Sequence, residues 1–284
     1  MNILITGGAG FIGSHLVEFH LKKGDEVFVV DNLSTGSVKN IESFLKNPRF
    51  HFEEDDLLTW KNLSDRTFWA DRIYHLAAMV GMYYLLANPV ETLVNNILGC
   101  ERLLRTMTEG GLQARLIVVS SSEIYGPSKK SHLSENDMLL FKAEAGSKWP
   151  YATSKFMEEM FSLAYACSKG VKVTLIRLFN TIGPRQRAHY GMVVPRFIEQ
   201  AVSNEPITVY GSGMQTRSFC DVRDVTVALD TIANNATTIG EIINLGNDEP
   251  ISINNLAKTI KRLAKSGSIA AGQGRSKTEA CSPW

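Results

Sequence analysis

The chain has 284 residues, of which 44% are hydrophobic and 21% charged, a composition typical of a globular protein with a sizeable core. Its 30 basic and 29 acidic side chains give a formal charge of +1, and the absence of a Lys/Arg run argues against a nucleic-acid partner. The four cysteines lie far apart without a CxxC pair, which argues against zinc or redox motifs. No apolar run reaches the roughly 18 residues that a spanning helix needs, so we expect a cytoplasmic protein without a membrane partner.

Short apolar runs alternate with amphipathic stretches over the first two thirds of the chain, a pattern that predicts βαβ units around a parallel sheet. We expect strands at residues 2–6, 26–30, 72–76, 116–120 and 171–178, and a late strand at 242–245 that rejoins the sheet. Helices are expected at 12–23, with Gly24 as the stop, and after Asn88 as an N-cap with Pro89 in the first turn. The fold class predicted is a doubly wound α/β sheet.

The segment TGGAGFIG at residues 6–13 lies between the first strand and the first helix. There a nucleotide pyrophosphate would meet backbone N–H groups and the positive end of the helix. The spacing GxxGxxG differs from the common GxGxxG fingerprint, and a plain glycine-rich turn is the alternative. Asp31 ends the second strand, where a carboxylate accepts hydrogen bonds from ribose hydroxyls and repels a 2′-phosphate, so NAD is favoured over NADP. The alternative for Asp31 is a turn residue.

Two further segments carry candidate catalytic groups. Tyr151 and Lys155 lie four residues apart on an expected helix. The ammonium would lower the tyrosine pKa, and the resulting phenolate could take a proton from a sugar hydroxyl. Ser121 follows the fourth expected strand, at the sheet edge where ligands bind in such folds. The alternatives are a tyrosine packed in the core beside a solvated lysine, and a serine that only caps the strand.

Taken in order, these motifs resemble the extended short-chain dehydrogenase/reductase family of nucleotide-sugar epimerases, dehydratases and decarboxylases. The resemblance is carried by TGxxGxxG at 6–13, HLAA at 75–78, Ser121 with YG at 125–126, YxxxK at 151–155 and RLFN at 177–180. It implies a Rossmann-type, doubly wound parallel sheet with a smaller C-terminal substrate-binding lobe, and an enzyme that oxidises a nucleotide sugar at C4. We therefore expect an NAD-binding domain at 1–179 and a nucleotide-sugar lobe at 180–265, partly interleaved with the core sheet.

The resemblance also implies particular site residues. The cofactor contacts fall on Gly7, Gly10, Phe11, Ile12, Gly13, Asp31, Asn32, Asp56, Leu57, Leu76, Ala77, Ala78, Tyr151 and Lys155. The catalytic groups fall on Ser121, Tyr151, Lys155 and Glu123, and the substrate contacts on Ser121, Ser122, Asn180, Val194 and Arg217. Asn180 and Arg217 match binders of the substrate diphosphate, although Arg217 could be an ordinary surface arginine. His75 is expected to be a structural hydrogen-bonding residue, and no metal is predicted.

Which reaction follows C4 oxidation is left open by the sequence. Glu123 resembles the carboxylate of the dehydratases and UDP-glucuronate decarboxylases, but Ser122 stands where a 4,6-dehydratase has Asp, and Phe156 where decarboxylases have Arg. The segments VYGSG at 209–213 and QTR at 215–217 resemble decarboxylases. A UDP-sugar 4-epimerase is narrowly favoured, with a UDP-glucuronate decarboxylase or 4,6-dehydratase as alternatives.

A non-catalytic sensor or scaffold that binds NAD and a nucleotide sugar is an alternative of another class, because of the C-terminal segment. Residues 266–284 are rich in Gly, Ser, Ala and Lys and lack apolar periodicity, so we predict a disordered or foreign tail. Family members continue differently there, with another phosphate-binding arginine. The expected helices at 88–109 and 151–169 resemble those that pair two subunits of the family through a four-helix bundle, which predicts a homodimer.

Overall fold

The structure is a computed structural model, and it describes residues 1–111, 113–128, 130, 132–144, 148–187, 192–268 and 270–274. Within these residues a sheet of seven parallel strands runs in the order β11-β6-β5-β4-β1-β2-β3. Its strands are β1 (Asn2–Thr6), β2 (Glu26–Asp31), β3 (Phe50–Glu54), β4 (Arg72–His75), β5 (Arg115–Ser121), β6 (Val173–Leu178) and β11 (Ile242–Leu245). This order confirms the doubly wound α/β fold, Rossmann-like in topology.

Apolar residues on both faces of the strands explain why this sheet lies inside the molecule. Leu4 of β1 and Leu116 of β5 are fully buried on one face, and Ile3 and Ile117 of the same strands are fully buried on the other. Two layers of helices must therefore cover the sheet. The late strand β11 pairs with β6, as predicted from residues 242–245.

The main sheet has one strand more than the sequence predicts, before residues 72–76, which were expected to be the third strand. Phe50–Glu54 forms β3, which pairs with β2 at the edge of the sheet. Its sequence FHFEE alternates aromatic and polar residues and is mostly only half buried. A search for continuously apolar runs passes over such a strand, because an edge strand does not need to be apolar on both faces.

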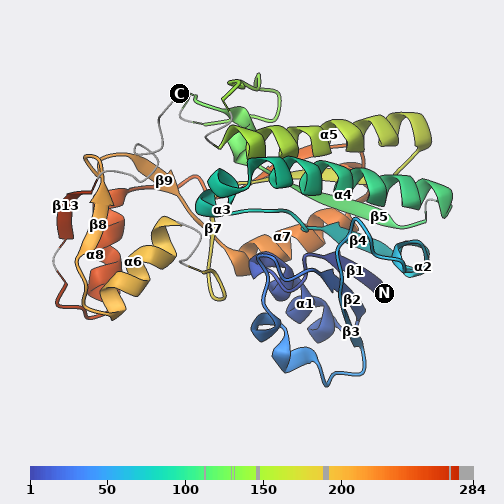
Figure 1. Ribbon diagram of the computed structural model, residues 1–284, viewed down its shortest axis with the longest axis horizontal. Helices are drawn as coiled ribbons and strands as arrows, with labels where there is room; N and C mark the ends of the chain where they lie inside the picture. The colour runs from blue at the N-terminus through green and yellow to red at the C-terminus, as the bar shows by residue number, and fades with distance from the viewer. Residues whose placement is uncertain are drawn as a thin grey trace.

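Helices cover both faces of the sheet (Figure 1). Helices α1 (Phe11–Lys23) and α7 (Val222–Asn234) pack together on one face, in the apolar cluster of Leu16 and Leu229. Helices α2 (Leu63–Trp69), α4 (Pro89–Glu109) and α5 (Trp149–Lys169) cover the other face. Gly24 ends α1 in the left-handed conformation with φ of 85°, as its sequence position predicts. Asn88 is the N-cap of α4, but its side chain makes no capping hydrogen bond.

A third apolar cluster, separate from those on the two faces of the sheet, holds a smaller lobe beside it, at the left of Figure 1. The lobe contains α6 (Val193–Val202), β8 (Ile207–Tyr210), β9 (Thr216–Ser218), β12 (Pro250–Ser252), α8 (Ile253–Leu263) and β13 (Ala270–Gly274). The chain returns to the main sheet between β9 and β12, through α7 and β11. The proposed division at residue 179 into two domains remains a prediction.

The predicted disordered tail needs one correction. Ala270–Gly274 forms β13, which pairs in parallel with β8, because backbone hydrogen bonding to an open strand edge needs no apolar periodicity. The end of the predicted tail, 275–284, lies outside the described residues.

Short elements complete the described chain. They are α3 (Met82–Ala87), β7 (Thr181–Ile182), β10 (Cys220–Asp221), and the 3-10 turns η1 (Val38–Asn40), η2 (Glu42–Phe44), η3 (Ser122–Tyr125) and η5 (Ala236–Thr238). Among the helices described, none combines the length and the apolar character needed to cross a membrane.

Candidate active site

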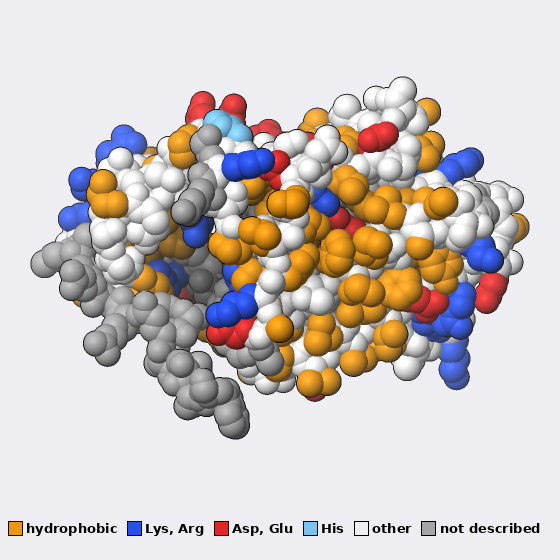
Figure 2. Space-filling model, turned by 90° about the horizontal axis from the view of Figure 1, so that it is seen from above, with side chains coloured by type: hydrophobic (Ala, Val, Ile, Leu, Met, Phe, Trp, Pro, Cys, Tyr) orange, Lys and Arg blue, Asp and Glu red, His pale blue; other side chains and the backbone are white. Residues whose placement is uncertain are grey.

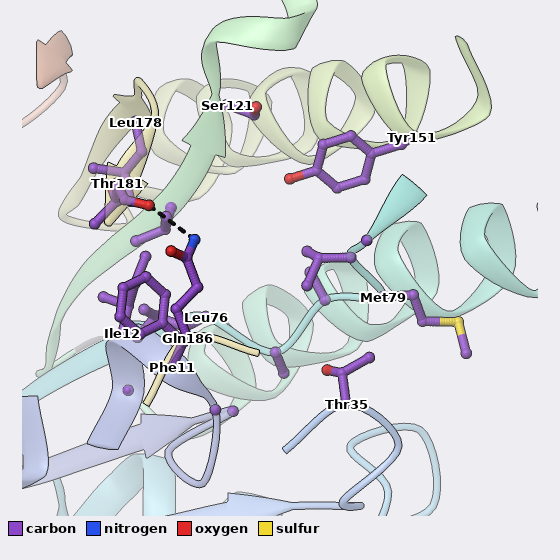
Figure 3. Close-up of a pocket in the computed structure, with 18 of the residues that line it drawn as sticks. Phe11, Ile12, Thr35, Leu76, Met79, Ser121, Tyr151, Leu178, Thr181 and Gln186 are labelled. Atoms are coloured by element: carbon purple, nitrogen blue, oxygen red, sulfur yellow. Dashed lines mark hydrogen bonds between the residues drawn. The ribbon is translucent and has the colours of Figure 1, made fainter. Parts of the chain in front are cut away.

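A cavity of about 600 Å³ opens at the carboxyl ends of the parallel strands and extends to the smaller lobe. Residues from β2, β5 and β6, the first turn of α1, the start of α5, and α6 and β9 of the lobe line it. Each site residue carried over from the family resemblance lies in its wall. Figure 3 shows Phe11, Ile12 and Leu76 on one side of this cavity and the Tyr151 ring projecting from α5 into it. The cavity therefore joins the predicted cofactor and substrate residues, while their individual roles remain predictions.

The glycines at the start of α1 let the backbone fold tightly against itself. Gly7 has a φ of +75°, and a Cβ there would lie 2.7 Å from the backbone N of Ala77. A Cβ at Gly13 would lie 2.3 Å from the carbonyl oxygen of Gly7. Gly10 is the N-cap of α1 and has no capping side chain. The turn thus presents backbone N–H groups without side chains in front of them, which fits a pyrophosphate.

Asp31 lies at the carboxyl end of β2, beside this glycine turn. Its carboxylate accepts hydrogen bonds from the backbone N of Ala9, at 2.9 Å, and of Leu33, at 2.8 Å. Burial raises the pKa of Asp31, against the opposing effect of these backbone hydrogen bonds. Next to it, Asn32 donates a 2.8 Å hydrogen bond to Asp56. The backbone contacts hold Asp31 at the cavity wall. The two interpretations of Asp31, a turn residue and a hydrogen-bond acceptor for the ribose, are therefore compatible.

The predicted catalytic groups meet at the end of β5 and the first turns of α5. Ser121 is the last residue of β5, and its hydroxyl accepts a hydrogen bond from the backbone N of Glu123 at 3.2 Å. Tyr151 and Lys155 lie one turn apart in α5, as the sequence spacing predicts. The Tyr151 hydroxyl points into the cavity on the side of Ser121 (Figure 3). A sugar hydroxyl in the cavity could therefore contact Ser121 and Tyr151 together.

The surroundings of Tyr151 shift its pKa in the direction opposite to the expected one. Burial raises the pKa of Tyr151 above its ordinary value of 10.0, and the opposing effects of Lys155 and Ser121 do not outweigh it. Lys155 is itself engaged by Glu158, with its Nζ 2.6 Å from a carboxylate oxygen of that residue. The spacing of Tyr151 and Lys155 indicates neither the burial of the phenol nor the counter-ion of the ammonium, three residues further along the same helix.

Glu123 is in η3, two residues after Ser121, and faces the same cavity. Its carboxylate forms an ion pair with Lys148, with 2.5 Å between Nζ and Oε2, and both side chains are about two-fifths exposed, at 39% and 42%. Lys148 is the N-cap residue of α5 and was not identified from the sequence. The cavity wall that holds Ser121 and Tyr151 therefore also holds a partly exposed ammonium and a partly exposed carboxylate.

The predicted substrate residues come from the boundary between the sheet and the lobe. Asn180 follows β6 and donates a hydrogen bond to the carbonyl oxygen of Ser218 at 3.1 Å. Val194 lies buried in the first turn of α6. Arg217 is exposed in β9, where its guanidinium donates to the carbonyl oxygen of Thr216 at 2.8 Å. These three residues and Ser122 line the cavity, so the structure brings them to one site.

Three residues near the site are buried: Asn96, His75 and Glu158. Of these, the sequence predicts a hydrogen-bonding role for His75 only. Asn96 of α4 accepts a hydrogen bond from the backbone N of Met79 and donates one to Ser154 of α5, which ties the loop after β4 to the catalytic helix. His75 accepts or donates through Nδ1 to Thr6 at 2.8 Å, as a structural role predicts, and burial lowers its pKa to about 3. Glu158 pairs with Lys155.

One group of metal-ligand types exists among the described residues. Single ligand atoms of His75, Cys100 and Glu158 lie within 4.8 Å of one another. The three residues are on β4, α4 and α5, so no sequence spacing could have indicated the group. The nearby Lys155 ammonium opposes a metal cation there, and the prediction of no metal remains a prediction.

The family model "NAD dependent epimerase/dehydratase family" matches residues 3–246. The chain belongs to the NAD-dependent epimerase/dehydratase family of enzymes, and its cofactor is NAD. The glycine turn and the Asp31 carboxylate at the end of β2 fit this cofactor.

Curated relatives cover nearly the whole chain. A UDP-glucuronic acid decarboxylase 1 from Xenopus tropicalis is 37% identical over 93% of this chain and 61% of the relative. A UDP-N-acetyl-alpha-D-glucosaminuronate decarboxylase from Bacillus cytotoxicus is 37% identical over 93% of this chain and 81% of the relative. The chain therefore spans less than two thirds of the length of the Xenopus relative.

Solved structures of this fold include enzymes with other reactions. A UDP-glucuronic acid 4-epimerase from Bacillus cereus, in complex with UDP-glucuronic acid and NAD, has a TM-score of 0.86 and 28% identity, over 97% of this chain and 87% of that one. A dTDP-glucose 4,6-dehydratase from Streptomyces venezuelae, with NAD bound, has a TM-score of 0.86 and 27% identity, over 98% of this chain and 86% of that one.

Proposed function

We propose that the protein oxidises a UDP-linked uronic acid at C4 and releases its C6 carboxylate as carbon dioxide. The decarboxylase relatives support this reaction better than the 4-epimerisation that the sequence narrowly favoured. The structural observation that carries the proposal is the Glu123–Lys148 ion pair in the cavity wall, directly beside Ser121. A C6 carboxylate could displace Glu123 and pair with the Lys148 ammonium.

The first step needs a base at the C4 hydroxyl. The Tyr151 phenolate would accept this proton, with Ser121 donating a hydrogen bond to the same oxygen. Bound NAD would supply the hydride acceptor for C4. Lys155 would lie on the nicotinamide ribose and stabilise the phenolate by its charge. Because burial raises the pKa of Tyr151, this stabilisation decides how much phenolate is present at neutral pH.

The second step follows from the position of the carboxylate. A 4-keto uronic acid is a β-keto acid, so breaking the C5–C6 bond moves an electron pair onto the C4 oxygen as carbon dioxide leaves. Tyr151 and Ser121 would donate hydrogen bonds to this enolate oxygen. C5 would then take up a proton from solvent, which Glu123, once released from Lys148, would be placed to relay. Return of the hydride to C4, with Tyr151 giving its proton back to the C4 oxygen, would complete the UDP-pentose and restore oxidised NAD. Asn180 and Arg217 are proposed to hold the diphosphate, since a guanidinium fork pairs well with phosphate oxygens.

A second candidate is 4-epimerisation of the same uronic acid. It is favoured by Phe156, which stands at the position of the arginine typical of decarboxylases and packs against Phe141, with 5.1 Å between ring centroids. The Bacillus cereus neighbour also binds a uronic acid and carries out this reaction. The non-catalytic sensor remains the alternative of another class, and it predicts NAD binding without turnover of any nucleotide sugar.

The substrate class is tested by presenting UDP-glucuronic acid, UDP-glucose, dTDP-glucose and a GDP-hexose separately to the NAD-loaded protein. We expect turnover of the UDP-uronic acid and little of the neutral sugars, measured by product mass and sugar NMR. Preferential turnover of a neutral hexose would contradict the proposal, as would NAD binding with no turnover of any of the four.

Lys148→Met tests the carboxylate contact. We expect the KM for UDP-glucuronic acid to rise about tenfold, because a charge-assisted hydrogen bond contributes about 1.5–3 kcal/mol. The matched control is Lys130→Met, which removes a lysine paired with Asp137 outside the cavity wall and should leave KM unchanged. Steady-state kinetics measure both, and equal KM values for the two variants would exclude the contact.

We propose that the protein is a homodimer that pairs through α4 and α5. Val90, Val94 and Leu98 lie one turn apart along α4 and are 70%, 41% and 48% exposed, and Met160 of α5 is 45% exposed. Figure 2 shows hydrophobic side chains gathered on this face of the molecule. An apolar face of this kind is typical of a subunit interface.

Leu98→Glu tests the dimer. The variant should run at the mass of one chain in light scattering, because a carboxylate buried without a partner at the interface is costly. Val202→Glu, at a 68% exposed position on α6 of the lobe, should keep the mass of two chains. A wild-type protein with the mass of one chain would rule the dimer out.

A further inference from the structure

A fully buried ion pair lies directly behind the catalytic tyrosine. The Lys155 Nζ is 2.6 Å from Oε2 of Glu158, one turn along α5, and the two side chains are 3% and 0% exposed. Lys155 also lines the cavity, whereas Glu158 does not. Glu158 is therefore out of reach of a substrate, and its effect on the active site must pass through Lys155.

Among the groups described around Glu158, Lys155 is the main one that stabilises its negative charge. Its second oxygen, Oε1, is buried with no hydrogen-bond partner in the described part of the chain. The groups that face it are neutral or negative: His75 from β4, whose pKa of about 3 keeps it uncharged, Cys100 from α4, whose pKa burial raises, and Glu159 from its own helix. Glu159 is itself held by Arg177, at 2.8 Å.

We propose that Glu158 is a positioning residue of the active site: it anchors the Lys155 ammonium against α5 and offsets part of its charge beside Tyr151. The part of this inference that concerns turnover rests on the proposed function, while the ion pair itself does not. A metal ion bound by His75, Cys100 and Glu158 is the competing use of these residues, and the ammonium already supplies the positive charge that Glu158 needs.

The charge of Glu158 has a definite direction of effect on the base. Burial raises the pKa of Glu158 to about 7, against the opposing charge of Lys155, so the carboxylate becomes ionised near neutral pH. Burial also raises the pKa of Tyr151, and the Glu158 charge raises it further, against Lys155. Removing that charge at constant shape must therefore make Tyr151 easier to ionise.

The ion pair is tested first by stability, without any substrate. Thermal unfolding is measured at about pH 8, where a carboxylate is ionised, for wild type, Lys155→Met, Glu158→Gln and the double variant. Breaking a buried pair leaves an uncompensated charge, which is strongly destabilising. We therefore expect Lys155→Met to lower the melting temperature, and the added Glu158→Gln to raise it again. If Glu158→Gln lowers the melting temperature equally in both backgrounds, the pair is not coupled and the proposal is overturned.

The effect on the base is tested by the pH dependence of kcat/KM. In Glu158→Gln the acidic limb should move down by about one pH unit, since a charge near a titrating group shifts its pKa by about 1–3 units. The matched control is Glu101→Gln on α4, whose carboxylate pairs with Tyr165 and Arg105 away from the cavity wall. The proposal would be overturned if the folded Glu158→Gln protein kept the apparent pKa of the acidic limb and only its maximal kcat/KM fell. If wild type turns nothing over, the proposed function fails, and the stability cycle still decides the ion pair.

Discussion

Tyr151→Phe is expected to lower turnover of the nucleotide sugar by about 10³-fold, in the range of 10²–10⁴ typical for loss of a general base. The substitution removes the one phenol that projects from α5 into the cavity near Ser121, among the residues described. The ring remains, so the packing at the start of α5 should persist. NAD affinity, measured by calorimetry, should stay close to that of wild type.

Tyr165→Phe provides the matched control in the same helix. Its hydroxyl donates a hydrogen bond to Glu101 and lies outside the cavity wall, so turnover should be unchanged. Full activity in Tyr151→Phe would show that the proton leaves C4 by another route. A wild-type protein that binds NAD but has no activity to lose would support the sensor alternative instead.

Gly13→Ala should remove most of the NAD affinity. The new Cβ would lie 2.3 Å from the carbonyl oxygen of Gly7 and 2.7 Å from the Cα of Gly8. Both are backbone atoms, so no change of side-chain rotamer can relieve the clash. The glycine turn must then move away from α1, and an overpacking cost of about 1–3 kcal/mol would lower affinity up to about 100-fold. Calorimetric titration with NAD measures the loss.

Gly99→Ala is the control for this substitution, because it is also a glycine inside a helix. A Cβ at Gly99 of α4 would meet only Leu57, at an ordinary contact distance of 3.5 Å. We expect its NAD affinity to match wild type, and its stability to rise slightly through better helix propensity. Unchanged NAD affinity in Gly13→Ala would mean that the glycine turn does not carry the cofactor.

The parts of the fold that sequence could predict are those with strong local signals. Leu4 and Leu116 lie in strands buried on both faces, which read as continuous apolar runs, and Gly24 ends α1 as a left-handed cap. Residues 50–54 give no such signal, because an edge strand can hold polar residues such as the exposed Glu54. The pairing of β13 with β8 likewise depends on backbone hydrogen bonds, which leave little trace in side-chain pattern.

The candidate site likewise contains residues that could be predicted from the sequence and residues that could not. Gly7, Tyr151 and Lys155 belong to motifs with fixed spacing, so their common location could be predicted. Lys148 could not, because its relevance depends on an ion pair with Glu123, 25 residues away in the chain. Glu158 was close to the YxxxK motif, but its importance arises from complete burial against β4 and α4, which a helical spacing alone does not reveal.

The reaction itself was beyond the sequence motifs, since epimerases, dehydratases and decarboxylases of the family share the same oxidising residues. The difference lies in what surrounds C5 and C6 of the sugar. In this chain Glu123 and Lys148 form an ion pair in the cavity wall, where we propose that C5 and C6 of the sugar bind. Such a pair favours a substrate with a carboxylate. Phe156 argues for retention of that carboxylate, and the relatives argue for its loss.

The most direct test of the central claim uses UDP-glucuronic acid labelled with ¹³C at C6. It is incubated with the NAD-loaded protein, and both the released gas and the remaining nucleotide sugar are measured by mass spectrometry and NMR. We expect labelled carbon dioxide and a UDP-pentose without the label. A product that keeps the label, with unchanged mass and inverted C4, would contradict decarboxylation and establish the protein as a 4-epimerase.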